Sequence, residues 1–364
     1  MAFNLPYSTT GSSMVVDFTA STQSVTAGAT ISFTDISSPT PTDWFWSISG
    51  GATTTTQNAI FLFSLPGTFS ISLLAANSTA GGVKLKTNYI SVLPLFLLDT
   101  YTSARAAYGV HKLRSDYTGD AFIIRRSNDN ATQSISYLSN GEVNEAAITS
   151  FVGSNSAYIQ TWFDQSVNAF HISQSTTSRQ PRIVNAGTID KVNGKVAPYF
   201  DGTHTLDRAA GDISIKDLRF ANFVYKRTAT TADFGAIIAT EYNESNGFWI
   251  GYIRDSLRWQ FWVKGANDST STYDMVVNQQ GIASINLEVG TNLSKRWIDT
   301  QLDTTITYSD LSGTSTSVFS VGGQGATNEY RWTGYIQDAI IWNVNFNDTQ
   351  RQAIETLQKT YFNF

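Results

Sequence analysis

The segment Thr68-Phe-Ser-Ile-Ser-Leu73 alternates hydroxyl-bearing and apolar side chains along its whole length. A period of two places the apolar residues on one face of a β-strand and the hydroxyls on the other. Short segments of this kind, separated by Gly, Pro, Ser, Thr and Asn, occur at residues 17–20, 30–34, 44–48, 59–63, 67–73 and 87–92. Regularly spaced short strands with turn residues between them predict a β-sandwich.

The rest of the chain continues the pattern, and strands are predicted at residues 157–162, 248–253, 257–263 and 334–342. Helical spacing is confined to three segments, which are residues 103–113, a turn capped by Asn144, and the last residues after Asn347 or Asp348. The sequence therefore predicts an almost all-β protein with a few short helices.

A change in composition near Leu95 predicts a domain boundary. The first 95 residues hold only five charged side chains, whereas Arg and Glu appear regularly after Leu95. We therefore predict an N-terminal arm at residues 1–15, a small sandwich at 16–94 and a larger domain at 95–364.

Charge and cysteine content exclude several classes of function. Of the 364 residues 15% are charged, the net charge is −5 and no long basic stretch occurs, so we expect no nucleic-acid partner. The absence of cysteine excludes disulfides, thiolate metal sites and a cysteine nucleophile. Residues 1–10 lack the features of a secretory signal, and no apolar stretch is long enough for membrane insertion.

Several stretches of the first domain form a recognisable set: Asp17-Phe-Thr-Ala20, residues 27–35, Trp46, Pro66-Gly67 with the strand that follows, and Asn88-Tyr-Ile-Ser-Val92. Over residues 16–93 they resemble the PKD domain, an immunoglobulin-like module that serves mostly as a spacer or interaction module. The resemblance implies that Trp46 fills the core between two sheets. Ser47-Ile-Ser-Gly-Gly51 stands where such domains usually have an aspartate-glycine run, which argues against a calcium-assisted turn.

The second domain carries two further sets of motifs. The first set is Ala106–Arg114, Phe122–Asp129, Trp162–Ser166 and Gln180–Val184, and it resembles the catalytic domain of α-L-arabinofuranosidase B. The second set, which begins at Tyr199-Phe-Asp-Gly202 and ends with residues 334–342 and the final helix, resembles the laminin-G/concanavalin-A-like lectin fold. Both resemblances imply a jelly-roll sandwich.

The resemblance to arabinofuranosidase B also implies where two catalytic carboxyl groups should stand. The strand aligned with the family's glutamate, residues 246–253, contains no acid, and Gln324 follows Gly322-Gly323 where the family has its aspartate. We therefore predict that the chain is not an enzyme and has no catalytic residues. Three other acids are left open as substitutes: Glu241, Glu244 and Asp255.

Other candidate sites have simpler structural explanations. We expect Asp164 and Gln165 to close a strand-end turn by bonding backbone amides, and Tyr199-Phe-Asp-Gly202 to be a strand that ends in a turn. A calcium role at the latter segment is the alternative. His111, His171 and His204 are scattered, so no metal site and no cofactor is predicted.

The chain is rich in aromatic residues, which bind sugars by stacking on their C–H faces. Our candidates for a carbohydrate site are Trp249, Tyr252, Trp259, Tyr330 and Trp332. The alternative is that these side chains, which recur at a period of two, form the core of a sheet.

Adhesive β-modules without a signal or catalytic acids favour a bacteriophage virion surface protein, such as a head fibre, a capsid decoration or a tail appendage. It would be made in a host cytoplasm, contact other virion proteins through its arm and first domain, bind a cell-surface glycan and form a homo-oligomer; an extracellular surface is the alternative location. Two other hypotheses stay open: a carbohydrate-active enzyme of arabinofuranosidase type or its binding module, and a purely structural virion subunit.

Overall fold

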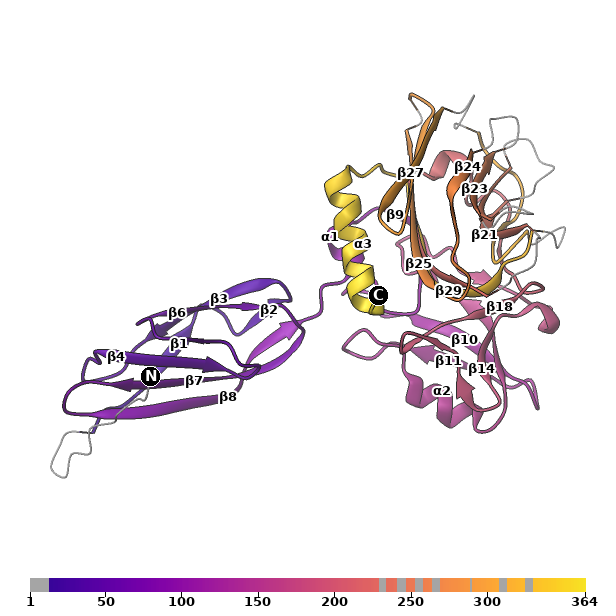
Figure 1. Ribbon diagram of the computed structural model, residues 1–364. Coiled ribbons are helices and arrows are strands. Elements are labelled where there is room, and N and C mark those ends of the chain that lie inside the picture. Colours follow the sequence, from indigo (N-terminus) through magenta and orange to yellow (C-terminus); the bar gives the residue numbers. More distant parts are fainter. Residues whose placement is uncertain are drawn as a thin grey trace. The chain divides into compact units, whose positions relative to one another are not determined.

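A computed structural model describes residues 13–228, 234–240, 247–252, 258–263, 269–288, 290–307, 313–324 and 330–364. The chain folds as two compact units, Met1–Leu95 (unit 1) and Phe96–Phe364 (unit 2), whose elements are labelled in Figure 1. The fold is all-β, as the sequence predicts. Within the described ranges, no helix has the length and apolar character needed to cross a membrane.

Unit 1 is a sandwich of a three-stranded and a five-stranded sheet. Its strands are β1 (Phe18–Ala20), β2 (Ser24–Thr26), β3 (Ala29–Asp35), β4 (Asp43–Ile48), β5 (Thr53–Thr54), β6 (Ala59–Phe63), β7 (Gly67–Ala76) and β8 (Gly81–Leu93). β1, β3 and β6 form one sheet, and β2, β8, β7, β4 and β5 form the other. The alternating segment 68–73, from which the sandwich is predicted, lies inside β7.

The core of unit 1 is built around Trp46, as predicted. Its side chain is fully buried, its ring packs edge-on against Phe18 with centroids 5.2 Å apart, and its indole N–H donates to the carbonyl oxygen of Thr56. A buried tryptophan combines a large apolar area with one polar atom that needs a partner, and both requirements are met here.

Unit 2 is dominated by one hydrogen-bonded sheet of 19 strands. The strands of unit 2 up to residue 227 are β9 (Ala104–Gly109), β10 (Asp120–Arg126), β11 (Thr132–Ser136), β12 (Ala157–Trp162), β13 (Ile172–Ser173), β14 (Arg182–Asn185), β15 (Thr188–Ile189), β16 (Lys191–Val192), β17 (Lys195–Val196), β18 (Tyr199–Asp201), β19 (Leu206–Arg208) and β20 (Phe220–Arg227). The later strands are β21 (Gly235–Ala239), β22 (Phe248–Tyr252), β23 (Arg258–Val263), β24 (Ser269–Asp274), β25 (Gln280–Glu288), β26 (Leu293–Ile298), β27 (Gln301–Thr307), β28 (Phe319–Val321) and β29 (Thr333–Trp342).

The described residues contain three α-helices: α1 (Leu97–Thr100), α2 (Glu145–Val152) and α3 (Asp348–Phe362). The predicted caps are confirmed, because the side chain of Asn144 accepts from the amide of Ala147 and that of Asn347 accepts from the amide of Gln350. The helix predicted at residues 103–113 is wrong. Residues 104–109 form β9, which pairs with β29 and is buried on both faces, so tertiary packing overrides a helical spacing made of small residues.

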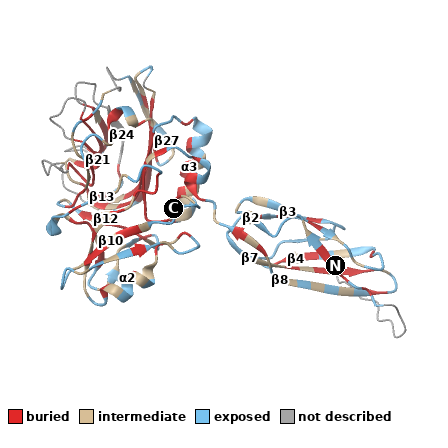
Figure 2. Ribbon diagram, turned by 180° about the vertical axis from the view of Figure 1, so that it is seen from behind, coloured by how far each residue is buried: buried red, intermediate tan, exposed pale blue. Residues whose placement is uncertain are grey.

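One face of the sheet in unit 2 forms the main core. Seven neighbouring strands contribute apolar residues to it, among them Trp162, Ile172, Leu206, Val321, Ile238, Ile250 and Phe261. All seven side chains are buried, as the red strands of Figure 2 illustrate. Because side chains alternate along a strand, the next residue of each strand must face the opposite side of this sheet.

Candidate functional site

The face opposite the main core carries a row of residues that we call the Asp207 row. Its members, taken in order across β12, β13, β19, β28, β21, β22 and β23, are Thr161, Ser173, Asp207, Ser320, Ala239, Trp249 and Trp262. Directly opposite residues of antiparallel strands point to the same side, so these side chains form one line. Within the described residues, Asp207 is the only carboxyl group of the row, and its nearest neighbours across the sheet, Ser173 and Ser320, are small.

Asp207 is partly buried, and its two carboxylate oxygens have different environments. Oδ2 accepts a hydrogen bond from the side-chain amide of Gln174 at 3.1 Å. Oδ1 is buried, and no hydrogen-bond donor contacts it among the described residues. A buried oxygen without a donor is poorly stabilised as an anion, which shifts the pKa of this carboxyl group upward.

The pKa of Asp207 follows from these contacts. Burial raises the pKa of this carboxyl group above its ordinary value. Hydrogen bonds from Ser320, Thr205 and Gln174 and the charge of Arg179 lower it, but they offset the effect of burial only in part. A carboxyl group with a raised pKa on a polar surface is a candidate general acid.

Two guanidinium groups lie close to the Asp207 end of the row. Nη2 of Arg179 donates to the hydroxyl of Thr205 at 2.8 Å, and Nη1 of Arg331 donates to the carbonyl oxygen of Gly202 at 3.4 Å. Burial lowers the pKa of Arg331, and the neighbouring charge of Arg179 lowers it further. This end of the row is therefore polar and positively charged around one carboxyl group.

The other end of the row is aromatic. Trp249 is buried under Tyr330, with ring centroids 5.8 Å apart and planes 18° from parallel, and Phe234 packs edge-on against both rings. Tyr330 and Trp262 are only partly buried. These two rings leave apolar surface beside the row, and Tyr330 is one of the five predicted sugar-stacking residues.

The other four predicted stacking residues lie in the interior. The exposed fraction is 1% for Trp249, 2% for Tyr252 and 0% for both Trp259 and Trp332. Tyr252, Trp259 and Trp332 belong to the main core, where Tyr252 also packs against the guanidinium of Arg227. For these four residues the structure favours the alternative, because a covered ring offers no face to a sugar.

The positions aligned with the family's catalytic acids lie near the same end of β21. Gln324 is buried, and its side-chain amide donates to the carbonyl oxygen of Thr240 at 3.0 Å. The hydroxyl of Thr240 accepts in turn from the amide of Phe248, at the start of β22. The substitute acids named from the sequence, Glu241, Glu244 and Asp255, lie outside the described residues.

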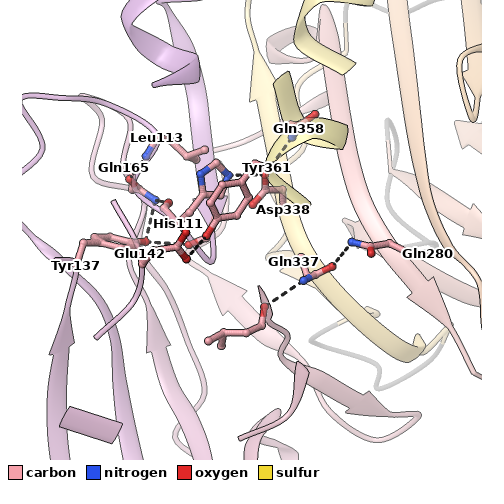
Figure 3. A network of polar contacts seen from close by, with 12 residues as sticks. His111, Leu113, Tyr137, Glu142, Gln165, Gln280, Gln337, Asp338, Gln358 and Tyr361 are labelled. Carbon is pink, nitrogen blue, oxygen red and sulfur yellow. Dashed lines mark hydrogen bonds and ion pairs between the residues drawn. The ribbon is translucent and has the colours of Figure 1, made fainter. Parts of the chain in front are cut away.

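The Trp162–Ser166 motif has a structural role, as expected. The carboxylate of Asp164 accepts hydrogen bonds from the backbone amides of Ala107, Ser166 and Phe170. Gln165 accepts from the amide of Leu113 and donates to the carbonyl oxygen of His111 and the hydroxyl of Tyr137, as Figure 3 shows. Because both side chains form several hydrogen bonds to neighbouring segments, the motif holds β9 and its loops in place.

Asp201 and the three histidines are also held by local contacts. The carboxylate of Asp201 accepts from the amide of Thr203, so Tyr199–Gly202 is a strand that ends in a turn. His111 contacts Asp338 at 3.1 Å, Nδ1 of His171 accepts from the amide of Asp164, and Nε2 of His204 lies 3.3 Å from Oδ2 of Asp201. Among the described residues, no group of three acids or histidines is placed to hold a metal ion.

Sequence reasoning missed Asp207. The available signal was the short alternation Leu206-Asp-Arg208, in which Leu206 faces the core and Asp207 faces the other side. Three residues are too few to distinguish a strand from a turn, and the partners that surround Asp207 come from distant parts of the chain.

Comparisons with known proteins place this geometry in context. Residues 98–199 match the family described as α-L-arabinofuranosidase B, catalytic, which agrees with the predicted resemblance of this part. The matched segment ends before Asp207. No curated protein sequence matches the chain.

Solved structures of α-L-arabinofuranosidases share the fold. A GH54 enzyme soaked with a cyclic sulfate inhibitor has a TM-score of 0.52 at 13% identity. A variant of a GH54 enzyme soaked with 4-nitrophenyl α-L-arabinofuranoside has 0.55 at 12%, and an arabinofuranosidase complexed with arabinofuranosyl-α-1,2-xylobiose has 0.51 at 15%. Each covers 72% of this chain, and this chain spans 63% of their length.

These findings correct two predictions. The expected role as a non-catalytic virion surface protein is contradicted by the match to a catalytic domain and by the arabinofuranosidase structures, and so is the prediction that the chain is not an enzyme. The findings favour the alternative, a carbohydrate-active protein of arabinofuranosidase type. The prediction gave most weight to the two aligned positions that lack an acid, although Glu241, Glu244 and Asp255 were left open as substitutes.

Proposed function

We propose that unit 2 is a glycosidase that hydrolyses α-L-arabinofuranosides, with Asp207 as its general acid. One observation carries the proposal: Asp207 is a carboxyl group of raised pKa on the face of the sheet opposite the main core, in a fold shared with arabinofuranosidases. The family match of residues 98–199 supports the substrate class.

The chemistry requires an acid that keeps its proton until the glycosidic oxygen takes it. Burial raises the pKa of Asp207, and since its side chain is only partly buried, the proton is delivered from Oδ2, which also accepts from the amide of Gln174. Such an acid donates its proton to the departing oxygen as the bond to the sugar carbon breaks, and it thereby avoids an unstable alkoxide leaving group. Tyr330 and Trp262 offer apolar surface along the same face for the rest of the substrate.

Glycosidases use two carboxyl groups, and Asp207 is the only one of the row within the described residues. The second group is sought by mutation among the three acids that the sequence names. Glu241→Gln, Glu244→Gln and Asp255→Asn are compared with wild type, and one of them is expected to abolish hydrolysis.

The test of Asp207 uses two substrates that differ in how much they need an acid. Asp207→Asn is expected to reduce kcat on arabinan about 10²- to 10⁴-fold, since positioned general acids contribute this much. The loss on 4-nitrophenyl α-L-arabinofuranoside should be much smaller, because nitrophenolate leaves without protonation. Asp116→Asn, the same change at an exposed aspartate, serves as the control.

The outcomes separate the roles that Asp207 could have. Equal losses on both substrates would show that Asp207 is not the acid, and full activity of Asp207→Asn would remove it from the mechanism. If the wild-type chain releases no sugar from either substrate, the proposed function fails.

For unit 1 we propose a spacer or interaction module of the PKD type. The sandwich of three and five strands with Trp46 in its core supports this. The predicted homo-oligomer and the extracellular location likewise remain predictions.

A further inference from the structure

Unit 2 contains a polar pocket that shares no residue with the Asp207 row. Its volume is about 430 Å³, which lies within the range of small-molecule sites. The lining residues are mostly amides, with one acid, one base and one aromatic ring: Asn193, Asn278, Gln279, Gln280, Asp299, Lys359 and Phe364.

The walls of the pocket come from four separate elements. Asn193 lies in the β16–β17 hairpin, Asn278 in the turn before β25, Asp299 in the β26–β27 turn, and Lys359 near the end of α3. The first three adopt left-handed backbone conformations, with φ of 47°, 65° and 48°. Asn and Asp tolerate this conformation better than most residues, so the same residue types that shape the turns also supply polar groups.

The buried end of the pocket is formed by Gln280, whose exposed fraction is 6%. Its amide orientation is set by Gln337, because Nε2 of Gln337 donates to the carbonyl oxygens of Val192 and Val196. Oε1 of Gln337 must then accept from Nε2 of Gln280, as Figure 3 shows. Oε1 of Gln280 is therefore left as a buried acceptor, and no donor contacts it among the described residues. An acceptor left unpaired beside the pocket costs free energy, and a ligand donor that reached it after a side-chain adjustment would remove that cost.

Asp299 provides a second acceptor at the rim. Oδ1 accepts from the amide of Ile282 at 3.0 Å, and within the described residues no donor contacts Oδ2. Burial raises the pKa of this carboxyl group, and the charge of Lys359 lowers it only in part. Gly281 leaves room for this arrangement, because a Cβ there would lie 3.2 Å from Oδ1.

The chemistry of the lining restricts the ligand. One carboxylate and one ammonium group balance, so the pocket does not select an ion. The four amide side chains and the acid of the lining suit a molecule with several hydroxyls, and the ring of Phe364 suits its C–H face. We propose that this pocket binds a neutral sugar residue and is a second carbohydrate site, separate from the Asp207 row.

The test measures sugar binding by the full-length chain. L-Arabinose, D-xylose, D-galactose and arabinotriose are titrated by calorimetry against wild type and against the double variant Asn278→Gly with Asp299→Asn. The introduced residues, Gly and Asn, both tolerate a left-handed backbone, so the turns are preserved. We expect the variant to lose one binding site, or to bind at that site at least tenfold more weakly, while a cooperative melting transition shows that it is still folded.

The matched control combines Asn292→Gly, at a left-handed position in the β25–β26 turn, with Asp116→Asn. It should bind as wild type does. Identical affinity and stoichiometry in the pocket variant and the wild type would overturn the proposal, as would the absence of binding by all four sugars. Hydrolysis is assayed on the same proteins: pocket variants should keep full activity, and Asp207→Asn should keep the pocket site, so failure of one proposal is distinguishable from failure of the other.

Discussion

Asp207 illustrates a conflict between function and stability at a single residue. The folded structure raises the pKa of its carboxyl group, so between the unfolded and folded pKa values the folded state binds more protons. The free energy of unfolding therefore falls as pH rises through that window, and the unfavourable contribution persists at neutral pH.

This sign leads to a prediction for Asp207→Asn. The variant should melt at a higher temperature than wild type at pH 7, because the amide removes the buried charge, and the difference should shrink as pH falls toward the unfolded pKa. Calorimetric scans from pH 3 to 8 check this. A variant that is less stable than wild type at pH 7 would show that the carboxylate is well solvated.

Asp164 shows the opposite use of a buried carboxylate. Its exposed fraction is 1%, but three backbone amides and the hydroxyl of Ser166 satisfy its oxygens. Asp164 follows the short strand β12, and Asp207 lies within the short strand β19. The two acids differ in the number of hydrogen-bond donors that contact their carboxylate oxygens. A sequence shows the acid but does not show how many donors surround it.

At the scale of elements, α3 carries a buried ion pair between two of its own residues, and each partner also contacts the sheet. Nη1 of Arg351 contacts Oε2 of Glu355 at 2.5 Å, and the hydroxyl of Ser284 on β25 donates to Oε1 of Glu355. The guanidinium also lies 4.5 Å from the ring centroid of Trp297. A buried ion pair of this kind contributes to stability mainly because each buried charge has a partner of opposite sign.

Glu355→Ala is therefore expected to lower the free energy of unfolding by about 3–5 kcal/mol, since it leaves the buried guanidinium of Arg351 with only the exposed Asp348, 3.7 Å away, as a charged partner. Ser284→Ala should cost less, about 1–3 kcal/mol, because it removes one neutral donor to Glu355 and leaves the buried side-chain amide of Asn222 without its acceptor. Denaturant unfolding monitored by tryptophan fluorescence measures both. Equal changes in the free energy of unfolding would show that losing the ion pair costs no more than losing the hydrogen bonds of Ser284.

The helix errors and successes also belong to this scale. Asn144 and Asn347 were predicted correctly because a cap is a local hydrogen bond within three residues. Residues 104–109 were predicted wrongly because Ala106 and Ala107 are small and buried on both faces of a strand. Only the pairing of β9 with β29 distinguishes that arrangement from a helix.

At the scale of the whole molecule, each unit has its own hydrophobic core. The cluster around Trp46 in unit 1 contains no residue from unit 2, and the converse holds for the main core of unit 2. Units with separate cores are expected to fold independently.

A protein cut to residues 96–364 should therefore fold and keep the hydrolytic activity proposed for Asp207, with a melting temperature within a few degrees of the corresponding transition of the full chain. Calorimetry of both proteins, with the arabinan assay beside it, provides the measurement. Aggregation of the shorter protein or loss of its activity would show that unit 2 depends on unit 1.

The all-β class, most strand positions, two helix caps and the likeness of residues 98–199 to an arabinofuranosidase can be predicted from sequence patterns alone. These features depend on residues close together in the chain, so a period of two or a capping asparagine is enough to reveal them. The aromatic candidates were ambiguous for the same reason, because periodicity places Trp259 or Trp332 in a strand without saying which face is covered.

The positions of the proposed sites depend on tertiary structure and cannot be predicted from local patterns. One row is formed by residues that lie up to 147 positions apart in the chain (320 − 173), namely Ser173, Asp207, Ala239 and Ser320. The pocket around Gln280 joins four elements in the same way. The physical reason is that antiparallel pairing of distant strands fixes which side chains meet, and burial by other elements then fixes their pKa and their unpaired atoms.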